Sequence, residues 1–319
     1  MAEHRFVSTA PIDRIAIDIL QQIAPVETAA DPQEQTLLNL LDGTIGLVVR
    51  GEGKATGRII EAGSDLRVIG RPGTGYDSVD VAAATARKIP VVYAPVGGFA
   101  VAEGALAMLL AVVKQLLPCD GAVRAGRWAE RYQRQTGDLA EHTLGIVGLG
   151  KIGAHLAALA RPFGMTILAY DPYADHGQAL EQGVELVSLV ELLGRSDYVS
   201  LHVPLNEETR GLINRERVGS MKRGAILINT SRGGVVESLD VLADALDDGR
   251  LEAVALDVFP QEPPDTTHRL FTQPRCVFAP HLVGASKLAM ERIFRSMAGD
   301  MVAVIQGARP RHCVNPEVL

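Results

Sequence analysis

Three polar residues, far apart in the chain, carry the side chains that a proton-coupled reduction needs: Arg232, Glu262 and His281. An imidazole can donate a proton near neutral pH, and a neighbouring carboxylate favours its charged form and holds its orientation. A guanidinium can bind a carboxylate through two hydrogen bonds and polarise an adjacent carbonyl oxygen. We therefore interpret the three residues as a candidate catalytic set for reducing a keto group.

Each of these residues follows a short apolar run that is typical of a buried strand. The runs are 225–229, 253–258 and 277–279. Ligands of open parallel sheets bind beyond the carboxyl ends of the strands. Each residue alone would more often be an ordinary loop side chain, but their shared position predicts that they meet at one edge of one sheet.

A fourth apolar run, 144–149, leads into the glycine pattern Gly148, Gly150 and Gly153 and then into an alanine-rich helical pattern, 155–160. In a dinucleotide-binding loop the first glycine permits a tight turn and the second lets the backbone approach a pyrophosphate. The third lets the helix pack closely on the strand. The amino terminus of the helix then offers free N–H groups to the phosphates.

An acidic residue stands where a ribose-binding carboxylate is expected. Asp171 follows the apolar run 166–170 and lies about 20 residues after Gly148. Its carboxylate can accept hydrogen bonds from ribose hydroxyls and would repel a 2′-phosphate. The pattern therefore predicts an NAD site and favours NAD over NADP.

Apolar runs alternate with amphipathic helical stretches along the chain, which predicts an α/β protein with two doubly wound parallel sheets. The runs in the first third are 5–9, 45–50, 66–70 and 91–94. Six runs follow residue 143: 144–149, 166–170, 198–203, 225–229, 253–258 and 277–279. We expect a buried helix over Ala100–Leu117 that ends at Pro118, and a helix over Lys287–Gln306 followed by an irregular tail.

Composition limits the classes of function. The chain has 319 residues, 47% hydrophobic and 22% charged, which suits two domains, and a formal net charge of −7, which disfavours a nucleic-acid partner. No apolar run reaches the length of a membrane span, and the first residues show no secretory signal pattern. Three scattered cysteines, Cys119, Cys276 and Cys313, predict neither disulfides nor a metal site. We expect a cytoplasmic protein without a metal ion.

Several stretches of the chain together resemble the family of D-isomer-specific 2-hydroxyacid dehydrogenases, which includes D-3-phosphoglycerate, D-glycerate (hydroxypyruvate reductase) and D-lactate dehydrogenases. The stretches are 71–80, 100–103, 143–153, 202–205, 230–234, 255–259 and 314–319. The resemblance implies a flavodoxin-like substrate domain formed by residues 1–98 and 287–319. It also implies an inserted Rossmann NAD-binding domain, 99–286, and an active site in a cleft that closes by hinge motion.

The resemblance also implies roles for individual residues. Arg232, Glu262 and His281 correspond to the family's catalytic set, with His281 as the acid and base. The implied cofactor contacts are Gly148, Gly150, Lys151, Ile152, Gly153, Asp171, His202, Pro204, Thr209, Thr230, Ser231, Arg232, Asp257, His281 and Gly284. The implied substrate contacts are Arg50, Gly73, Thr74, Gly75 and Arg232.

Further expectations concern individual positions. Arg50 and Lys54 could meet a second anionic group of the substrate or could be ordinary loop charges. Val283 stands where relatives often have a smaller residue. We expect Trp128 to pack rather than to contact a ligand, and His202 to be structural or to face the cofactor.

The expected function is NAD-dependent hydride transfer at C2 of a small D-2-hydroxy or 2-keto acid, by a homodimer formed through Ala100–Leu117. One alternative is an NAD-sensing corepressor-like scaffold, since fold does not determine function. Another is phosphite oxidation, because phosphite enzymes of this group retain the acid, whereas formate enzymes replace it by an amide. The chain carries no long regulatory extension, so we expect no feedback control by that route.

Overall fold

The computed structural model describes residues 4–319, so the expectation about a signal pattern rests partly on residues outside it. The chain divides into two compact units. One contains the residues up to Gly98 together with Ser286–Leu319, and the other is Phe99–Ala285. The later junction lies one residue before the expected one, because Ser286 caps the C-terminal helix through its hydroxyl.

The first unit is a five-stranded parallel sheet with the strand order β2-β1-β3-β4-β5, which is the flavodoxin-like doubly wound order. Its strands are β1 (Arg5–Ser8), β2 (Val26–Thr28), β3 (Thr44–Val48), β4 (Val68–Arg71) and β5 (Val91–Tyr93). Its helices are α1 (Arg14–Leu20), α2 (Glu34–Leu38), α3 (Gly57–Ala62), α4 (Val81–Ala86) and α12 (Lys287–Ile305). Strand β2 was not predicted, because this short edge strand has no buried residue and hence no apolar run.

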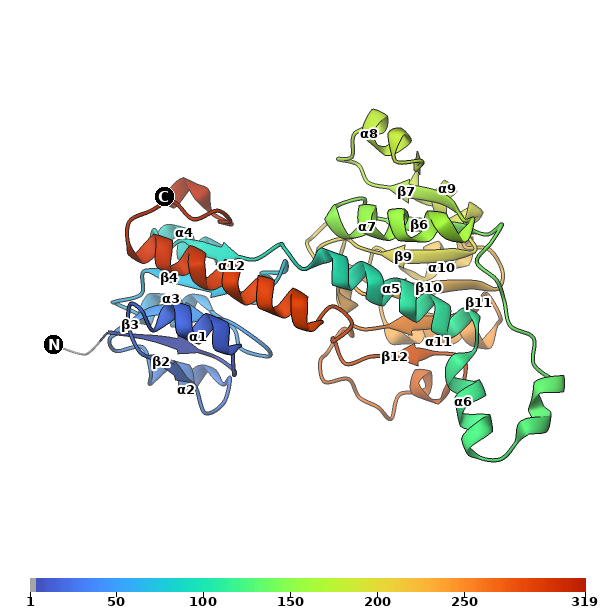
Figure 1. Cartoon of the computed structure of the whole chain (residues 1–319), viewed down its shortest axis with the longest axis horizontal. Coiled ribbons are helices and arrows are strands. Elements are labelled where there is room, and N and C mark those ends of the chain that lie inside the picture. The colour runs from blue at the N-terminus through green and yellow to red at the C-terminus, as the bar shows by residue number, and fades with distance from the viewer. Residues whose placement is uncertain (1–3) are drawn as a thin grey trace. The chain divides into compact units, whose positions relative to one another are not determined.

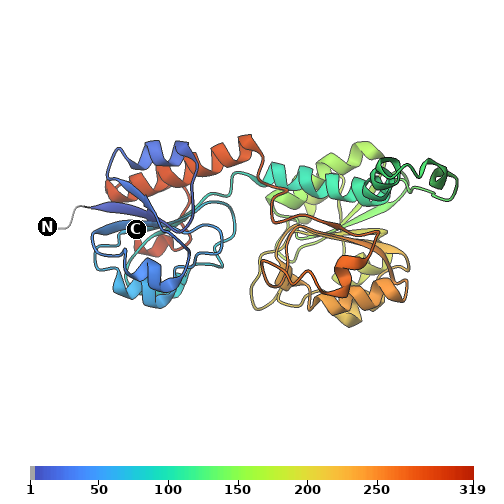
Figure 2. The ribbon, with the colours of Figure 1, turned by 90° about the horizontal axis from the view of Figure 1, so that it is seen from below.

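Alternate strand residues fill two cores, one on each face of this sheet. Phe6, Val48, Val68 and Val92 pack with α1 and α12, whereas their neighbours Val7, Leu47, Ile69 and Val91 pack with α2, α3 and α4. Figure 2 shows helices on both sides of the sheet. The burial of both faces explains why β3 to β5 appear in the sequence as continuous apolar runs.

The C-terminal tail is tied to β5 by Asn315, which is only 1% exposed. Its side-chain oxygen accepts a hydrogen bond from the Val91 N–H at 2.8 Å. Its amide nitrogen donates to the Ile89 carbonyl and to the Thr85 hydroxyl, both at 3.0 Å. The tail, which was expected to be irregular, therefore contributes to the edge of the first unit and ends in a short 3-10 helix, Pro316–Val318.

The second unit is a seven-stranded parallel sheet with the order β12-β11-β10-β9-β6-β7-β8. The strands are β6 (Thr143–Val147), β7 (Thr166–Tyr170), β8 (Glu185–Leu186), β9 (Tyr198–Leu201), β10 (Ala225–Asn229), β11 (Leu251–Leu256) and β12 (Val277–Phe278). This is the Rossmann order with one further strand. Six strands were predicted, and the one that was missed is the two-residue edge strand β8.

Helices cover both faces of this sheet as well (Figure 1). On one face α5 (Gly98–Val113) and α7 (Lys151–Ala160) pack against residues such as Ile146 and Ile228. On the other face α9 (Leu189–Arg195), α10 (Arg215–Ser220) and α11 (Leu239–Asp247) pack against Val147 and Leu227. A short helix α8 (His176–Glu181) lies between β7 and β8.

The expected helix Ala100–Leu117 is two helices, so the prediction that Pro118 ends it was wrong. Helix α5 ends at Val113, Gln115 has a left-handed backbone (φ 51°), and α6 spans Leu116–Arg124. Pro118 lies in the first turn of α6, where backbone N–H groups have no partner within the helix, and proline is therefore tolerated.

No single helix within residues 4–319 has both the length and the hydropathy of a membrane span. Only α5 and α6 taken together reach them, and this pair is bent by 59°. Seven residues of α5 are buried.

Candidate active site

The glycine-rich loop between β6 and α7 has the shape that a pyrophosphate requires. Gly148 has φ +95°, and a Cβ there would lie 2.7 Å from the carbonyl oxygen of His202. A Cβ on Gly153 would lie 2.1 Å from the carbonyl oxygen of Gly148, so helix and loop are in direct contact. Gly150 is the N-cap of α7 and has open space where its side chain would be. Two glycines are thus required sterically, and the third keeps the helix amino terminus accessible to an anion.

Asp171 lies beside this loop with a fixed carboxylate. Its Oδ2 accepts a hydrogen bond from the Leu149 N–H, and its Oδ1 accepts one from the Tyr173 N–H, both at 2.9 Å. A carboxylate offers about four acceptor positions, so about two remain for the hydrogen-bond donors of a ligand.

Two buried polar atoms at the same edge have no hydrogen-bond partner within residues 4–319: Nδ1 of His202 and Oγ1 of Thr230. Buried polar groups are nearly always paired, so these atoms fit a polar ligand. The other ring nitrogen of His202 lies 2.8 Å from the Ser200 hydroxyl. Burial lowers the pKa of His202 from 6.5 to about 4, so the imidazole is neutral in the physiological range.

The segment after β9 is a closed turn around Asn206. The Thr209 hydroxyl donates to the carbonyl oxygen of Pro204 at 2.5 Å, and the N–H groups of Glu208 and Thr209 donate to the side-chain oxygen of Asn206. Pro204 and Thr209, both expected cofactor contacts, therefore belong to one rigid turn. Lys151 and Ile152 are the first two residues of α7.

A residue missed at the sequence level shapes the loop that carries Arg232. The side-chain oxygen of Asn229, 1% exposed, accepts hydrogen bonds from the Ser231 N–H and hydroxyl. Its amide nitrogen donates to the carbonyl oxygen of Arg232 at 2.9 Å. The signal that could have identified Asn229 is an amide at the end of an otherwise apolar strand.

The loop after β10 also touches the loop after β11. A Cβ on Gly233 would lie 1.9 Å from the carbonyl carbon of Phe259, so only glycine fits. The Phe259 N–H donates to Oε1 of Glu262 at 3.0 Å. This close approach brings the segments of Arg232 and Glu262 together.

Glu262 and His281 form a direct pair. Oε2 of Glu262 lies 2.8 Å from Nδ1 of His281, and their side chains are 37% and 46% exposed, so the pair is accessible to a ligand. Partial burial alone would raise the pKa of Glu262. The hydrogen bonds from His281 and Phe259 and the charges of His281 and Arg232 outweigh it and lower that pKa below its ordinary value. Glu262 is therefore ionised at neutral pH, with the charge of Arg232 nearby.

The backbone of His281 is held in an uncommon conformation by Asp257. His281 has φ +54°, a left-handed conformation that costs about 1–2 kcal/mol for a residue with a side chain. Its N–H donates to the Asp257 carbonyl at 2.8 Å, and the Asp257 carboxylate accepts from the Leu282 N–H at 2.8 Å. Burial raises the pKa of Asp257 although these N–H groups favour its charged form.

The segment after His281 packs against α5. A Cβ on Gly104 would lie 2.5 Å from the Val283 side chain, and a Cβ on Gly284 would lie 2.6 Å from Val101. The larger residue at position 283 is thus accommodated by a glycine on the facing helix.

Of the expected substrate residues, Arg232 lies in the second unit, whereas Arg50, Gly73, Thr74 and Gly75 lie in the first, at the carboxyl ends of the adjacent strands β3 and β4. The Arg50 guanidinium lies over the Phe294 ring, 5.1 Å from its centre, and donates to the Pro11 carbonyl. Gly73 has φ +106°, and Thr74 and Gly75 follow it in a loop.

The second unit has a Rossmann sheet whose carboxyl edge carries a glycine-rich loop, the Asp171 carboxylate and two unpaired buried polar atoms. These features are typical of an NAD-binding α/β protein. Within that class, residues 106–283 match the model of the NAD-binding domain of D-isomer-specific 2-hydroxyacid dehydrogenases. The chain belongs to that family.

Relatives agree with this assignment. The chain is 38% identical over 305 residues to D-3-phosphoglycerate dehydrogenase of a Synechocystis strain, which covers 95% of this chain and 54% of the relative. It is 36% identical over 313 residues to that of Methanocaldococcus jannaschii, with 98% and 59% covered. The chain thus spans little more than half the length of these curated relatives.

Solved structures match at full length. A crystal structure of a protein from Thermus thermophilus is 33% identical with a TM-score of 0.89, covering 97% of this chain and 99% of that one. D-lactate dehydrogenase from Aquifex aeolicus, in complex with NAD and lactic acid, is 27% identical with a TM-score of 0.90, covering 98% of this chain and 99% of that one.

Among residues 4–319, no group of three or more His, Cys, Asp or Glu side chains is placed to hold a metal ion.

The lowered pKa of His202 predicts an acid-dependent loss of stability. The unfolded chain binds a proton at His202 near pH 6.5, whereas the folded chain does so only near pH 4. Stability from this site is complete above pH 6.5 and falls as the pH drops from 6.5 towards 4. Urea titrations at several pH values should show a smaller loss for His202→Gln, and the exposed-helix variant His176→Gln should behave as wild type. Equal pH dependence in wild type and His202→Gln would contradict this role of burial.

Proposed function

We propose that this chain is an NAD-dependent oxidoreductase that transfers a hydride between nicotinamide and C2 of a small D-2-hydroxy or 2-keto acid. The observation that carries the proposal is the Glu262–His281 pair at 2.8 Å, with Arg232 on the neighbouring strand end. Family membership supports the reaction class. The names of the relatives, D-3-phosphoglycerate and D-lactate dehydrogenases, support a small acid as substrate.

The chemistry divides between the cofactor and the chain. NAD, when bound, supplies or accepts the hydride. His281 donates the proton to the substrate oxygen during reduction and accepts it during oxidation. Ionised Glu262 stabilises the protonated imidazole and orients the ring through Nδ1, which directs the other ring nitrogen to the substrate. Arg232 binds the substrate carboxylate and polarises the carbonyl.

We assign NAD binding to the carboxyl edge of the second sheet. The loop Gly148–Gly153 with Lys151 and Ile152 would hold the pyrophosphate, and Asp171 the adenosine ribose. The remaining expected contacts follow successive strands of the same edge: His202, Pro204, Thr209, Thr230, Ser231, Arg232, Asp257, His281 and Gly284.

We assign binding of the substrate carboxylate to backbone N–H groups of Gly73–Gly75, together with Arg232. Consecutive N–H groups in such a loop form an anion-binding nest. Arg50 is the candidate for a second anionic group, because its guanidinium lies at the end of β3 with a stacking partner, Phe294, that orients it. Lys54 is an exposed alternative.

Turnover tests the proposed function. NADH should be oxidised in the presence of hydroxypyruvate, glyoxylate, pyruvate or a phosphorylated 2-keto acid, followed by absorbance at the nicotinamide band. No oxidation with any of these acids, under conditions where NADH binds, would contradict the proposal.

The matched control for this assay is His281→Ala. Removal of the proton donor should lower kcat by about 10²–10⁴-fold and leave the Kd for NADH within about twofold. An equal loss of NADH binding would contradict the role assigned to the imidazole.

We also propose a homodimer. The arm formed by α6 and the 3-10 helix Trp128–Tyr132 projects from the second unit (Figures 1 and 2) and exposes Leu116, Leu117, Val123, Trp128 and Tyr132. Trp128 is 61% exposed, so the expectation that it packs within the chain was wrong. At the base of the arm lies a cavity of about 380 Å³ lined by residues such as Pro118, Tyr198 and Cys276. A partner's arm would cover the exposed apolar side chains of this arm.

Sedimentation equilibrium tests the dimer. Wild type should sediment as a dimer, and a charged substitution of Leu117 should weaken association. A monomeric wild type at micromolar concentration would contradict the proposal.

The other expectations remain proposals: a cytoplasmic location, supported by three unpaired cysteines, and no nucleic-acid partner, supported by the negative net charge.

A further inference from the structure

Two loops on opposite sides of the glycine-rich loop are joined by one side-chain hydrogen bond. Strand β6 lies between β7 and β9 in the sheet, so the segments after β7 and β9 flank the loop that starts at Gly148. Tyr173 comes from the first of these segments and Glu208 from the second. The Tyr173 hydroxyl donates to Oε2 of Glu208 at 3.2 Å. The pair therefore spans the crevice above the glycine-rich loop, where the sheet changes winding direction and dinucleotides bind.

This bond continues a chain of hydrogen bonds that begins at the loop itself. The Leu149 N–H donates to Asp171, and Asp171 accepts a second bond from the Tyr173 N–H. Tyr173 then donates through its hydroxyl to Glu208, whose own N–H donates to Asn206. Tyr173 thus fixes the position of the Glu208 carboxylate relative to that of Asp171, which is expected to bind the ribose.

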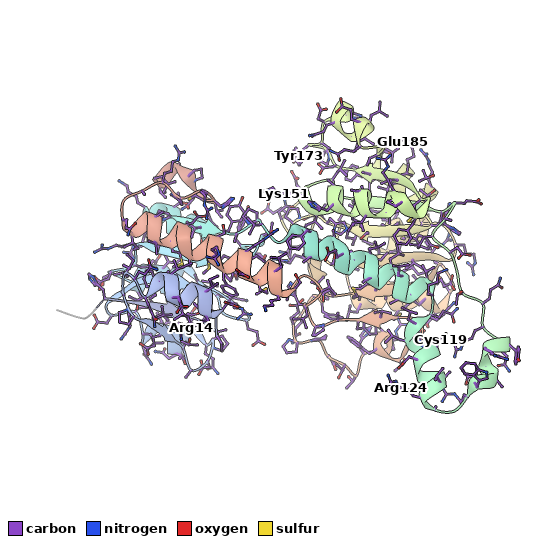
Figure 3. The ribbon with its side chains drawn as sticks, viewed as in Figure 1. Arg14, Cys119, Arg124, Lys151, Tyr173 and Glu185 are labelled. Atoms are coloured by element: carbon purple, nitrogen blue, oxygen red, sulfur yellow. The ribbon has the colours of Figure 1, made fainter. Side chains whose placement is uncertain are left out.

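Tyr173 follows the carboxyl end of β7, next to the strand β6 that leads into α7 at Lys151; Figure 3 labels both side chains. Tyr173 is 82% exposed, so its ring is available to a ligand rather than packed in a core. The charge of Glu208, the hydrogen bond to it and, to a smaller extent, the charge of Asp171 raise the pKa of Tyr173. The phenol therefore stays protonated at neutral pH and acts as a donor between two carboxylates.

A dinucleotide in this crevice places its adenosine ribose at Asp171. A free 2′-hydroxyl can donate a hydrogen bond to a carboxylate. A 2′-phosphate brings about two further negative charges to the same place and has no proton to donate at neutral pH. It would face Asp171 and, across the crevice, Glu208.

We propose that Glu208, held across the crevice by Tyr173, is a specificity-determining residue that acts with Asp171 to select a dinucleotide with a free 2′-hydroxyl over one with a 2′-phosphate. The proposal rests on the proposed function, because it requires NAD to bind in the crevice. It adds a repulsive element on a second loop to the single acidic residue recognisable in the sequence.

The test is Glu208→Gln, which keeps an oxygen acceptor for Tyr173 and removes the charge. Isothermal titration calorimetry with the full chain gives the Kd for NADH and for NADPH. Loss of the repulsion should lower the Kd for NADPH by about fivefold or more and leave that for NADH within about twofold. The effect should shrink at high ionic strength, because exposed charges are screened.

Glu207→Gln is the matched control, since it removes the same charge from the adjacent residue and leaves the Tyr173–Glu208 bond in place. It should change the ratio of the two Kd values by less than about twofold. Tyr173→Phe, which releases Glu208, should lower the Kd for NADPH less than Glu208→Gln does. The double variant should match Glu208→Gln, because the two residues act as one unit.

Two results would overturn the inference: equal changes in the Kd values for NADH and NADPH in Glu208→Gln, or an effect of Glu207→Gln as large as that of Glu208→Gln. Absence of NADH binding by the wild-type chain would instead overturn the proposed function itself.

Discussion

The contact between Nδ1 of His281 and Oε2 of Glu262 is the interaction on which the chemical interpretation of this structure depends. It exists because two loops approach within backbone contact at Gly233 and Phe259, and because Asp257 holds the turn that carries His281. In the proposed reaction these three residues support the site and are not assigned the proton transfer. Their contribution is to place an imidazole, a carboxylate and a guanidinium at three neighbouring strand ends.

Much of this arrangement could be predicted from the sequence, because parallel strands buried on both faces leave continuous apolar runs. The residues after 225–229, 253–258 and 277–279 were expected at one edge, and the strands occur there as β10, β11 and β12. The glycine pattern could be recognised in the sequence because each of its glycines is required for a separate structural reason. Two of those reasons appear as contacts of 2.7 and 2.1 Å that a side chain would make at Gly148 and Gly153.

The parts that could not be predicted depend on tertiary contacts or on very short elements. Edge strands β2 and β8 have too few residues to show a period. The break between α5 and α6 depends on a left-handed Gln115, and no local pattern marks it. The Tyr173–Glu208 bond joins residues 35 positions apart, whose proximity only the folded sheet creates. A hydrogen bond between distant side chains, unlike apolar periodicity, leaves no spacing rule in a single sequence.

The most direct test of the acid–base pair is the pH dependence of NADH-driven reduction in wild type and in Glu262→Gln. The lowered pKa of Glu262 means that its carboxylate is charged across the neutral range and stabilises the proton on the imidazole throughout. Its removal should move the alkaline fall in rate to lower pH, with the Kd for NADH unchanged. An alkaline limb at the same pH in both proteins would contradict the account.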